Sequence, residues 1–239
     1  CSTSNCWVGY QIEYNGSLYG LGYGATSGRE VFVTNGTSWD LLIDLSPGMN
    51  FGIPKMTNPT EFVEYDGWLY FQTGAHAGQS LYRTNGTASG TSQFVESSVY
   101  TYARNIVFNN ELYFVRDGIL YGTDYELWKT NGTSSGTGLV KEIDPSSSSS
   151  MCTDWAPCYG DGFQIIGNRL LFAANDGGNG TELWVTDGTS SGTVMVKDIN
   201  PSGNSDPDDF YVINKFLYFF AITGPNRRDF LHRDGTSQR

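Results

Sequence analysis

Five Asn-x-Ser/Thr triplets carry the clearest chemical signal in this chain, because the triplet is the acceptor sequence for N-linked glycans. Two other asparagines, Asn58 and Asn200, are blocked because proline follows each of them. Asn-Gly also suits tight turns, so turn chemistry alone would produce the same triplets. The predicted acceptors are Asn15, Asn35, Asn85, Asn131 and Asn179. We therefore expect covalent N-glycans on exposed turns.

Four cysteines lie in two close pairs, Cys1 with Cys6 and Cys152 with Cys158. Each pair precedes the first predicted strand of a repeat, so we expect two local disulfide loops, formed in an oxidising compartment. The alternatives are two pairs of free thiols, or a lipoprotein that is acylated on Cys1. Because the chain starts at Cys1 and not at Met, we interpret it as a mature secreted product from which a leader has been removed.

One loop, residues 175–180, has the oxygen content of a calcium site. It lacks the alternating ligands and the distant bidentate glutamate of an EF-hand. A glycine-rich strand connector explains the same residues, and the sequon at Asn179 competes for the loop. We therefore predict no cofactor and keep calcium, held at Asp176 and Asn179, as the metal alternative.

The residues that could act in catalysis form no recognisable site. The two histidines, His76 and His232, have neither the spacing of a zinc site nor that of a catalytic triad. Glu30, Glu126 and Glu182 recur at one repeat position, whereas a glycosidase needs two carboxylates with different roles. We predict that the protein is not an enzyme.

These residues are spaced by an internal repeat. Thr-Asn-Gly-Thr begins at Thr34, Thr84 and Thr130, and it returns as Thr-Asp-Gly-Thr at Thr186 and Arg-Asp-Gly-Thr at Arg233. The turn glycines are 50, 46, 56 and 47 residues apart, a period typical of a propeller blade. They are Gly36, Gly86, Gly132, Gly188 and Gly235.

Each copy reads as four short strands. In the second copy, aromatic and β-branched runs at 62–65, 68–71, 80–83 and 93–96 are separated by Asp-Gly, a loop and Asn-Gly. Tyrosine recurs in the second strand, with Phe172 in the fourth copy, and these rings are expected in the core. The recurring tyrosines are Tyr70, Tyr113 and Tyr218.

One four-stranded sheet buries too little surface alone, so the copies must pack on one another. The predicted fold is all-β: a five-bladed β-propeller of four-stranded antiparallel blades in one repeat domain, 1–239. The predicted blades are 8–46, 61–98, 105–144, 162–200 and 209–239, with 1–7 as a closing or exchanged segment. An open β-solenoid is the alternative.

The fifth copy lacks its own outer strand, because the sequence reaches the turn at Gly235 and stops at Arg239. A bare third strand would expose unpaired backbone groups on an aromatic-rich edge. We expect either residues 1–7 of the same chain or a strand of a neighbouring chain to fill the position. The predicted assembly edge is Asp229, Phe230, Leu231, His232 and Arg233.

The charge of the chain argues against several partners. Lys and Arg number 14 against 25 acids, for a net charge of -11, so the basic surface that holds nucleic acid or anionic lipid is missing. No apolar run reaches the roughly 20 residues of a membrane helix. We expect neither nucleic-acid binding nor membrane insertion.

The fourth copy resembles the secreted ELWxxDGT-type repeat proteins. It reads Glu182-Leu-Trp-Val-Thr-Asp-Gly-Thr189, and the third copy keeps Glu126-Leu-Trp128. The other copies are degenerate, with Glu30-Val-Phe32, Ser80-Leu-Tyr82 and Asp229-Phe-Leu231. The resemblance implies an extracellular, propeller-like surface or adhesive protein, and it transfers no catalytic residue.

Together these patterns favour a glycosylated extracellular or cell-surface subunit of a fibre, appendage or surface layer, whose partners are copies of itself. The alternative is a monomeric, lectin-like propeller that binds extracellular polysaccharide, since residues such as Tyr100, Tyr102 or Trp155 could stack on sugar rings. A propeller-type hydrolase is a third hypothesis.

Overall fold

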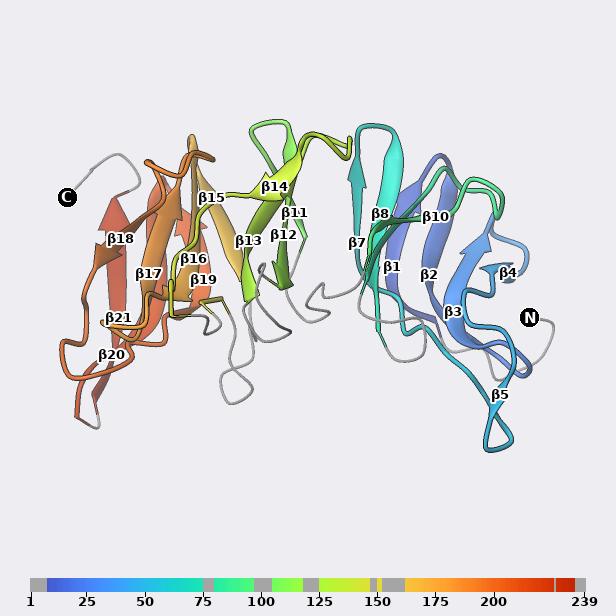
Figure 1. Ribbon diagram of the computed structural model, residues 1–239, viewed down its shortest axis with the longest axis horizontal. Helices are drawn as coiled ribbons and strands as arrows, with labels where there is room; N and C mark the ends of the chain where they lie inside the picture. Colours follow the sequence, from blue (N-terminus) through green and yellow to red (C-terminus); the bar gives the residue numbers. More distant parts are fainter. Residues whose placement is uncertain are drawn as a thin grey trace. The chain divides into compact units, whose positions relative to one another are not determined.

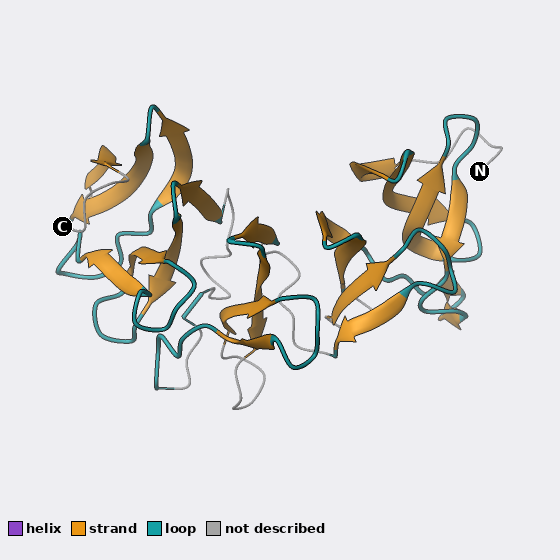
Figure 2. Cartoon of the chain, turned by 90° about the horizontal axis from the view of Figure 1, so that it is seen from above, coloured by secondary structure: helices purple, strands orange, loops and turns teal. Residues whose placement is uncertain are grey.

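The computed structural model describes residues 8–74, 80–96, 105–117, 125–146, 150–151, 162–225 and 227–234. Every regular element in these ranges is a β-strand (Figures 1 and 2). The chain divides into two compact units, residues 1–101 and 102–239. The fold is therefore all-β, as the sequence predicts.

The first unit contains two four-stranded antiparallel sheets and a small hairpin. The first sheet is β1 (Val8–Tyr14), β2 (Ser17–Gly24), β3 (Gly28–Thr34) and β4 (Asp40–Ile43). The hairpin is β5 (Met49–Asn50) and β6 (Ile53–Pro54). The second sheet is β7 (Thr60–Tyr65), β8 (Trp68–Thr73), β9 (Ser80–Thr84) and β10 (Ser92–Val95).

The second unit contains two four-stranded sheets and one three-stranded sheet. The third sheet of the chain is β11 (Ile106–Phe108), β12 (Glu111–Asp117), β13 (Tyr125–Thr130) and β14 (Thr137–Leu139). The fourth is β15 (Phe163–Ile166), β16 (Arg169–Asn175), β17 (Thr181–Thr186) and β18 (Val194–Lys197). The last is β19 (Asp208–Ile213), β20 (Phe216–Gly224) and β21 (Arg227–Asp234). In all five sheets, consecutive strands are neighbours.

Two-residue turns reverse the chain between the first and second strands of the sheets. Asn15 and Gly16 have φ angles of 49° and 76°, and Asp66 and Gly67 have 49° and 72°. Left-handed conformations at both positions define the turn that matches the twist of a hairpin, and Asn-Gly and Asp-Gly adopt it at little cost. Because Asn-Gly and Asp-Gly mark these turns, the strand boundaries can be predicted from the sequence.

The repeated Thr-Asn-Gly-Thr phrase forms the turn between the third and fourth strands. In the second sheet, Asn85 Oδ1 accepts hydrogen bonds from Thr87 N and Thr87 Oγ1, at 3.1 and 2.8 Å. Thr87 Oγ1 accepts from Gly90 N at 3.0 Å, and Thr91 Oγ1 donates to Thr84 Oγ1 at 2.8 Å. Nearly the same bonds recur at 130–137 and 186–193. The phrase therefore recurs because its side chains make the hydrogen bonds that form this turn.

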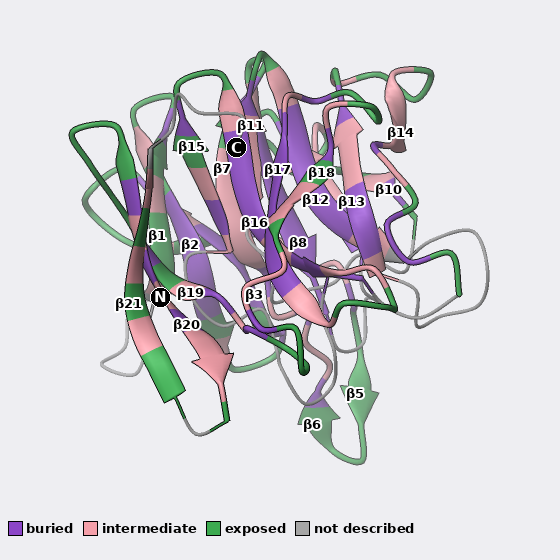
Figure 3. Cartoon of the chain, turned by 90° about the vertical axis from the view of Figure 1, so that its left-hand side faces the viewer, coloured by how far each residue is buried: buried purple, intermediate pink, exposed green. Residues whose placement is uncertain are grey.

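The sheets within each unit pack face to face through apolar side chains. In the first unit, Tyr19 and Val31 of the first sheet meet Leu69 and Phe71 of the second. In the second unit, a cluster joins the fourth and last sheets, and Figure 3 shows the central strands as the most buried elements. Burying each such side chain contributes roughly 1.5–3 kcal/mol. A single sheet could not gain this, so the repeat folds as an array.

The register corrects one sequence-based expectation. In the third sheet, Tyr113 pairs with Lys129. The repeat equivalent of Lys129 in the fourth sheet is Val185, and Val185 pairs with Leu171, not with Phe172. Phe172 is fully buried one position later, on the opposite face of the strand. The sequence repeat aligns Tyr113 with Phe172 because both are aromatic, whereas the strand pairing shows that Leu171 is the equivalent of Tyr113.

Candidate functional site: the outer strand of the last sheet

In the described residues the last sheet has three strands, whereas each of the other four large sheets has four. β21 pairs with β20 along one side, from Phe216 with Asp234 to Gly224 with Arg227. In the part of the chain that the structure describes, no strand pairs with the other side of β21. The residues of the predicted assembly edge, Asp229 to Arg233, all lie in this strand.

Side-chain contacts hold β21 in place. Asp229 Oδ2 accepts a hydrogen bond from Thr223 Oγ1 at 2.6 Å and forms an ion pair with Arg227 Nε at 2.7 Å. The Thr223 hydroxyl, and after it Arg227, hold the pKa of Asp229 below its ordinary value. Leu231 packs into the apolar cluster that joins the last sheet to the fourth. These contacts connect β21 to Thr223 of β20 and to the apolar cluster of its own unit.

The opposite face of the last sheet is aromatic and open. Tyr218 stacks on Phe230 with ring centroids 5.6 Å apart, and on His232 at 5.9 Å. Phe230 is 57% exposed, whereas Leu183, at the equivalent position of the fourth sheet, is 1% exposed. In the fourth sheet the following sheet covers this face. The last sheet therefore exposes aromatic side chains on this face.

A groove of about 900 Å³ runs between the fourth and last sheets. Its apolar residues come from β15 to β18, and Arg233 of β21 and Lys215 of the β19–β20 turn also line it. Arg169 also lines it and pairs with Asp187 at 3.4 Å. The apolar lining residues are Ile166, Leu171, Val185, Val194, Met195 and Val196.

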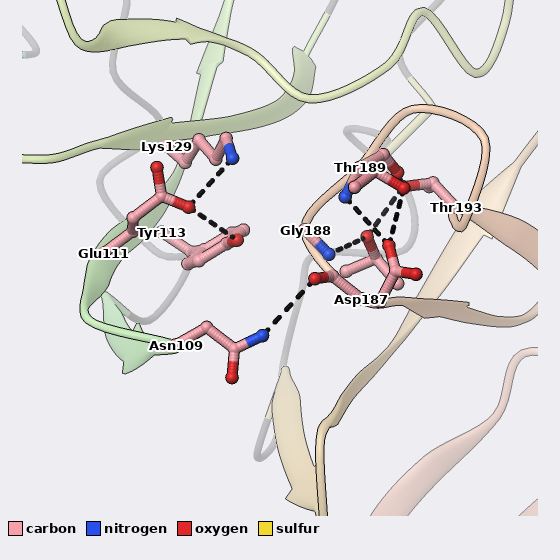
Figure 4. A network of polar contacts seen from close by, with 9 residues as sticks. Asn109, Glu111, Tyr113, Lys129, Asp187, Gly188, Thr189 and Thr193 are labelled. Atoms are coloured by element: carbon pink, nitrogen blue, oxygen red, sulfur yellow. Dashed lines mark hydrogen bonds and ion pairs between the residues drawn. The ribbon is translucent and has the colours of Figure 1, made fainter.

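The junction between the third and fourth sheets shows how two four-stranded sheets contact each other. Asn109 Nδ2 donates to the Asp187 carbonyl at 3.3 Å, and the Tyr113 hydroxyl lies against Gly188 (Figure 4). Glu111 Oε2 accepts from the Tyr113 hydroxyl at 3.4 Å and from Lys129 Nζ at 2.8 Å. The repeat turn of one sheet is thus seated on the second strand of the preceding sheet.

The recurring glutamates are buried structural anchors. Glu182 Oε2 accepts hydrogen bonds from Ile199 N at 2.9 Å and Ser205 Oγ at 2.7 Å. The Ser205 carbonyl in turn accepts from Ile222 N of β20 at 2.7 Å. The carboxylate therefore holds the connector that leads from the fourth sheet into the last one.

The same anchor is present at two other junctions. Glu30 accepts from Thr57 Oγ1 at 2.6 Å, and the Thr57 carbonyl accepts from Gly74 N at 2.7 Å. Glu126 accepts from Ile143 N at 3.3 Å. Each of the three glutamates is 0% exposed. In the second sheet the position is Ser80, and the chain's two units divide at the connector that follows this sheet.

Burial sets the protonation of these carboxyl groups. Desolvation raises the pKa of Glu126 to about 8 and that of Glu30 to about 7, against the lowering effect of their hydrogen-bond donors. Desolvation also raises the pKa of Glu182. A group that is sealed from solvent and engaged by backbone donors is placed for structure, not for contact with a substrate.

All five sequon asparagines lie on exposed turns. Asn131 Oδ1 accepts from Thr133 N and Thr133 Oγ1, at 3.1 and 2.7 Å, so the side-chain carbonyl serves the turn. Asn179 differs because its Nδ2, the atom that a glycan would modify, donates to Asp176 Oδ2 at 2.8 Å. The turn interpretation thus holds at these sites, and glycosylation stays a prediction.

The loop considered for calcium closes on itself. Asp176 Oδ1 accepts from Gly178 N at 3.0 Å and Asn179 N at 2.8 Å, and these donors lower the pKa of Asp176. Among the described residues, no group of three His, Cys, Asp or Glu side chains could hold a metal ion. The carboxylate is therefore committed to the loop's own backbone.

Several predicted residues lie outside the described ranges. They are the four cysteines, His76, Tyr100, Tyr102 and Trp155. The disulfide and sugar-stacking predictions therefore stay predictions. His232 is described and is an exposed member of the aromatic face.

The sequence comparison did not reveal the groove or the hydroxyl partners of the glutamates. A signal for the partners exists: Thr57, Ser150 and Ser205 each lie in the connector after a glutamate strand. Because the connectors differ in length, the hydroxyl residues fall 27, 24 and 23 positions after Glu30, Glu126 and Glu182, and no fixed motif marks them.

The chain matches no protein-family model, and no curated protein is significantly similar to it. The resemblance to ELWxxDGT-type repeats therefore stays a prediction. No helix in the described residues is long and apolar enough to cross a membrane.

Solved structures do share the fold. A puromycin hydrolase S511A mutant matches with a TM-score of 0.59 and 11% identity, over 98% of this chain and 37% of that one. A structure from a study of two prolyl endopeptidases matches with a TM-score of 0.51 and 15% identity, over 90% of this chain and 32% of that one. The chain thus spans about a third of their length. These matches place the chain among β-propeller-like folds.

Proposed function

We propose that the protein is a secreted, glycosylated structural subunit of an extracellular assembly, and that it self-associates when a strand completes the last sheet. The five sheets would be the five blades of a propeller. The observation that carries the proposal is β21, a fully formed strand with a ladder on one side. Within the described ranges, four sheets have four strands and the last sheet has three.

The exposed aromatic face adds to this argument. Tyr211, Ile213 and Phe230 are 55–57% exposed on one small sheet. Exposed apolar clusters of this kind mark surfaces that bind another protein.

The proposal is tested by the state of association of the purified full chain. We expect size to increase with concentration in light scattering, and electron microscopy to show fibres or layers. Phe230→Asp should raise the concentration needed for assembly, whereas Ser135→Asp, an exposed turn substitution in the third sheet, should not. Isolated particles at every concentration would overturn the proposal.

An enzymatic function is the competing hypothesis, because the matched structures include a puromycin hydrolase and prolyl endopeptidases. The identities of 11% and 15% support the fold alone, and most of those proteins' length has no counterpart here. Peptidase assays on the purified chain test it. Reproducible turnover by the purified chain would favour catalysis over a structural role.

A further inference from the structure

Five asparagines of this chain are followed directly by glycine, and their turns are built in different ways. They are Asn15, Asn35, Asn85, Asn131 and Asn179. In this pair the backbone nitrogen of the glycine can attack the side-chain carbonyl carbon of the asparagine, because glycine has no Cβ to hinder closure of the five-membered ring. The same chemistry is therefore offered at five places, and the folded turns decide where it proceeds.

Three of these turns hold both reacting groups in hydrogen bonds. At Asn131, Oδ1 accepts from Thr133 N at 3.1 Å and from Thr133 Oγ1 at 2.7 Å. The attacking nitrogen, Gly132 N, donates to Thr130 Oγ1 at 3.0 Å. The same three bonds are present in the turns of Asn35 and Asn85. Ring closure at these turns therefore requires that three hydrogen bonds break first.

Asn179 is restrained by a different contact. Its Nδ2 donates to Asp176 Oδ2 at 2.8 Å, and its backbone N donates to Asp176 Oδ1 at 2.8 Å. The backbone donors of this loop keep the pKa of Asp176 below its ordinary value, so the carboxylate is ionised. A neighbouring negative charge opposes removal of a proton from the backbone amide that must attack. The reaction is therefore disfavoured at this loop.

Asn15 lacks these restraints. The residue before it is Tyr14, where the three other turns have threonine, and the Tyr14 hydroxyl donates to the Gly67 carbonyl at 2.7 Å. The Asn15 side chain hydrogen-bonds to the same hydroxyl, a contact that does not involve Gly16 N. Both Asn15 and Gly16 are exposed, and nothing lies within 4 Å of a Cβ built on Gly16. Solvent therefore reaches this peptide bond.

We propose that Asn15 is a site of spontaneous deamidation in the folded protein. Hydroxide removes the proton from Gly16 N, which then attacks Cγ of Asn15. The N–Cγ bond forms, the Cγ–Nδ2 bond breaks, and Nδ2 takes a proton from water and leaves as ammonia. Water then opens the succinimide at one of its two carbonyl carbons. Opening at Cγ gives aspartate, whereas opening at the backbone carbonyl gives isoaspartate.

The two products should affect the first sheet differently. The turn joins β1 to β2 with Tyr14 paired to Ser17, and Tyr14 also contacts the next sheet through Gly67. Aspartate fits this turn, because Asp66 adopts the same φ of 49° in the equivalent turn of the second sheet. Isoaspartate carries the chain through Cγ, so it adds a methylene to a two-residue hairpin and disturbs its register. Deamidation therefore introduces an acid and a backbone defect at one defined hairpin.

The inference goes beyond the proposed function and holds whether or not the chain assembles. The full chain, from a host without N-glycosylation, is incubated folded at mildly alkaline pH in heavy-oxygen water. Peptide mapping then measures labelled aspartate and isoaspartate at each Asn-Gly pair. We expect Asn15 to react at least about tenfold faster than Asn35, Asn85 and Asn131, because of the bonds that those turns must break. An equal or slower rate at Asn15 would overturn the inference.

Two controls show whether the turn bonds cause the difference. In the chain unfolded in urea, the five pairs should react at similar rates, because the reacting groups are then the same. Thr34→Val removes the acceptor of Gly36 N with little change in shape, and it should speed reaction at Asn35 by about threefold or more while Asn15 keeps its rate. Circular dichroism checks the fold of this variant. If the unfolded chain keeps the same ranking, or if Asn35 is not faster in the folded variant, the turn bonds do not select the site and the inference fails.

Discussion

The hydroxyl oxygen of Tyr113 lies so close to Gly188 that a Cβ on the glycine would stand 2.5 Å from it. The two residues belong to successive sheets of one unit, and Tyr19 and Gly86 repeat the relationship in the other unit at 2.6 Å. Glycine is therefore required at position 188 for two reasons: its φ is +93°, and the Tyr113 hydroxyl leaves no room for a side chain. A motif that looks like turn chemistry in the sequence is also a docking point between sheets.

Gly188→Ala should destabilise the protein more than Gly36→Ala. Gly36 has a similar φ of +102° but nothing within 4 Å of a Cβ, so its substitution carries only the backbone cost of about 1–2 kcal/mol. Gly188→Ala adds overpacking against Tyr113, about 1–3 kcal/mol more. Chemical denaturation of both variants measures the difference, and equal losses would contradict the docking role.

The strand pattern was predictable because its turns are local. Asn15-Gly16 and Asp66-Gly67 fix hairpins with two residues each, and the sequence marks them directly. These features depend on residues that are close together in the chain.

The anchors and the groove were not predictable because they depend on residues far apart. Ser205 meets Glu182 across 23 positions, through a connector whose length differs from copy to copy. Phe172 was wrongly placed at the position of the recurring tyrosines, since only the strand register shows that Leu171 occupies it. The recurrence of Glu30, Glu126 and Glu182 did indicate a structural role. It did not identify the residues that donate hydrogen bonds to them.

The buried Glu126 should make the protein less stable as the pH rises. Its pKa in the folded protein is raised to about 8 from an ordinary 4.5, so the folded state binds more protons than the unfolded state between these values. Stability is then fully present below about pH 4.5 and is lost as the pH rises toward 8. Each pKa unit corresponds to about 1.4 kcal/mol, so the loss is on the order of a few kcal/mol.

Glu126→Gln tests this dependence, because the amide keeps a hydrogen-bond acceptor without a titratable proton. Denaturant unfolding at pH 5 and pH 8 should show a smaller difference in the variant than in the wild type. Glu96→Gln removes an exposed carboxylate and serves as the control. An unchanged pH profile in Glu126→Gln would show that this carboxyl group does not set the dependence.

Asn131→Asp should abolish glycosylation at this position while leaving the turn intact. Asp187 makes the same bonds, with Oδ1 accepting from Thr189 N at 2.9 Å and from Thr189 Oγ1 at 2.7 Å. The variant should therefore unfold within about 0.5 kcal/mol of the unglycosylated wild type, whereas Asn131→Ala should lose about 1 kcal/mol. Intact-mass measurement after expression in a glycosylating host reports the glycan, and no mass difference between wild type and Asn131→Asp would remove Asn131 from the predicted acceptors.

Phe51 should be replaceable by asparagine with a gain in stability. It lies at the tip of the β5–β6 hairpin with a φ of +50°, and it is 100% exposed. A bulky residue at positive φ is strained, whereas asparagine followed by Gly52 suits this turn. Phe51→Asn should raise the free energy of unfolding by about 1 kcal/mol, measured by chemical denaturation of the dilute, unassembled protein. A loss of stability would mean that the ring makes a contact in solution, and the hairpin would then have to be considered as a second docking element.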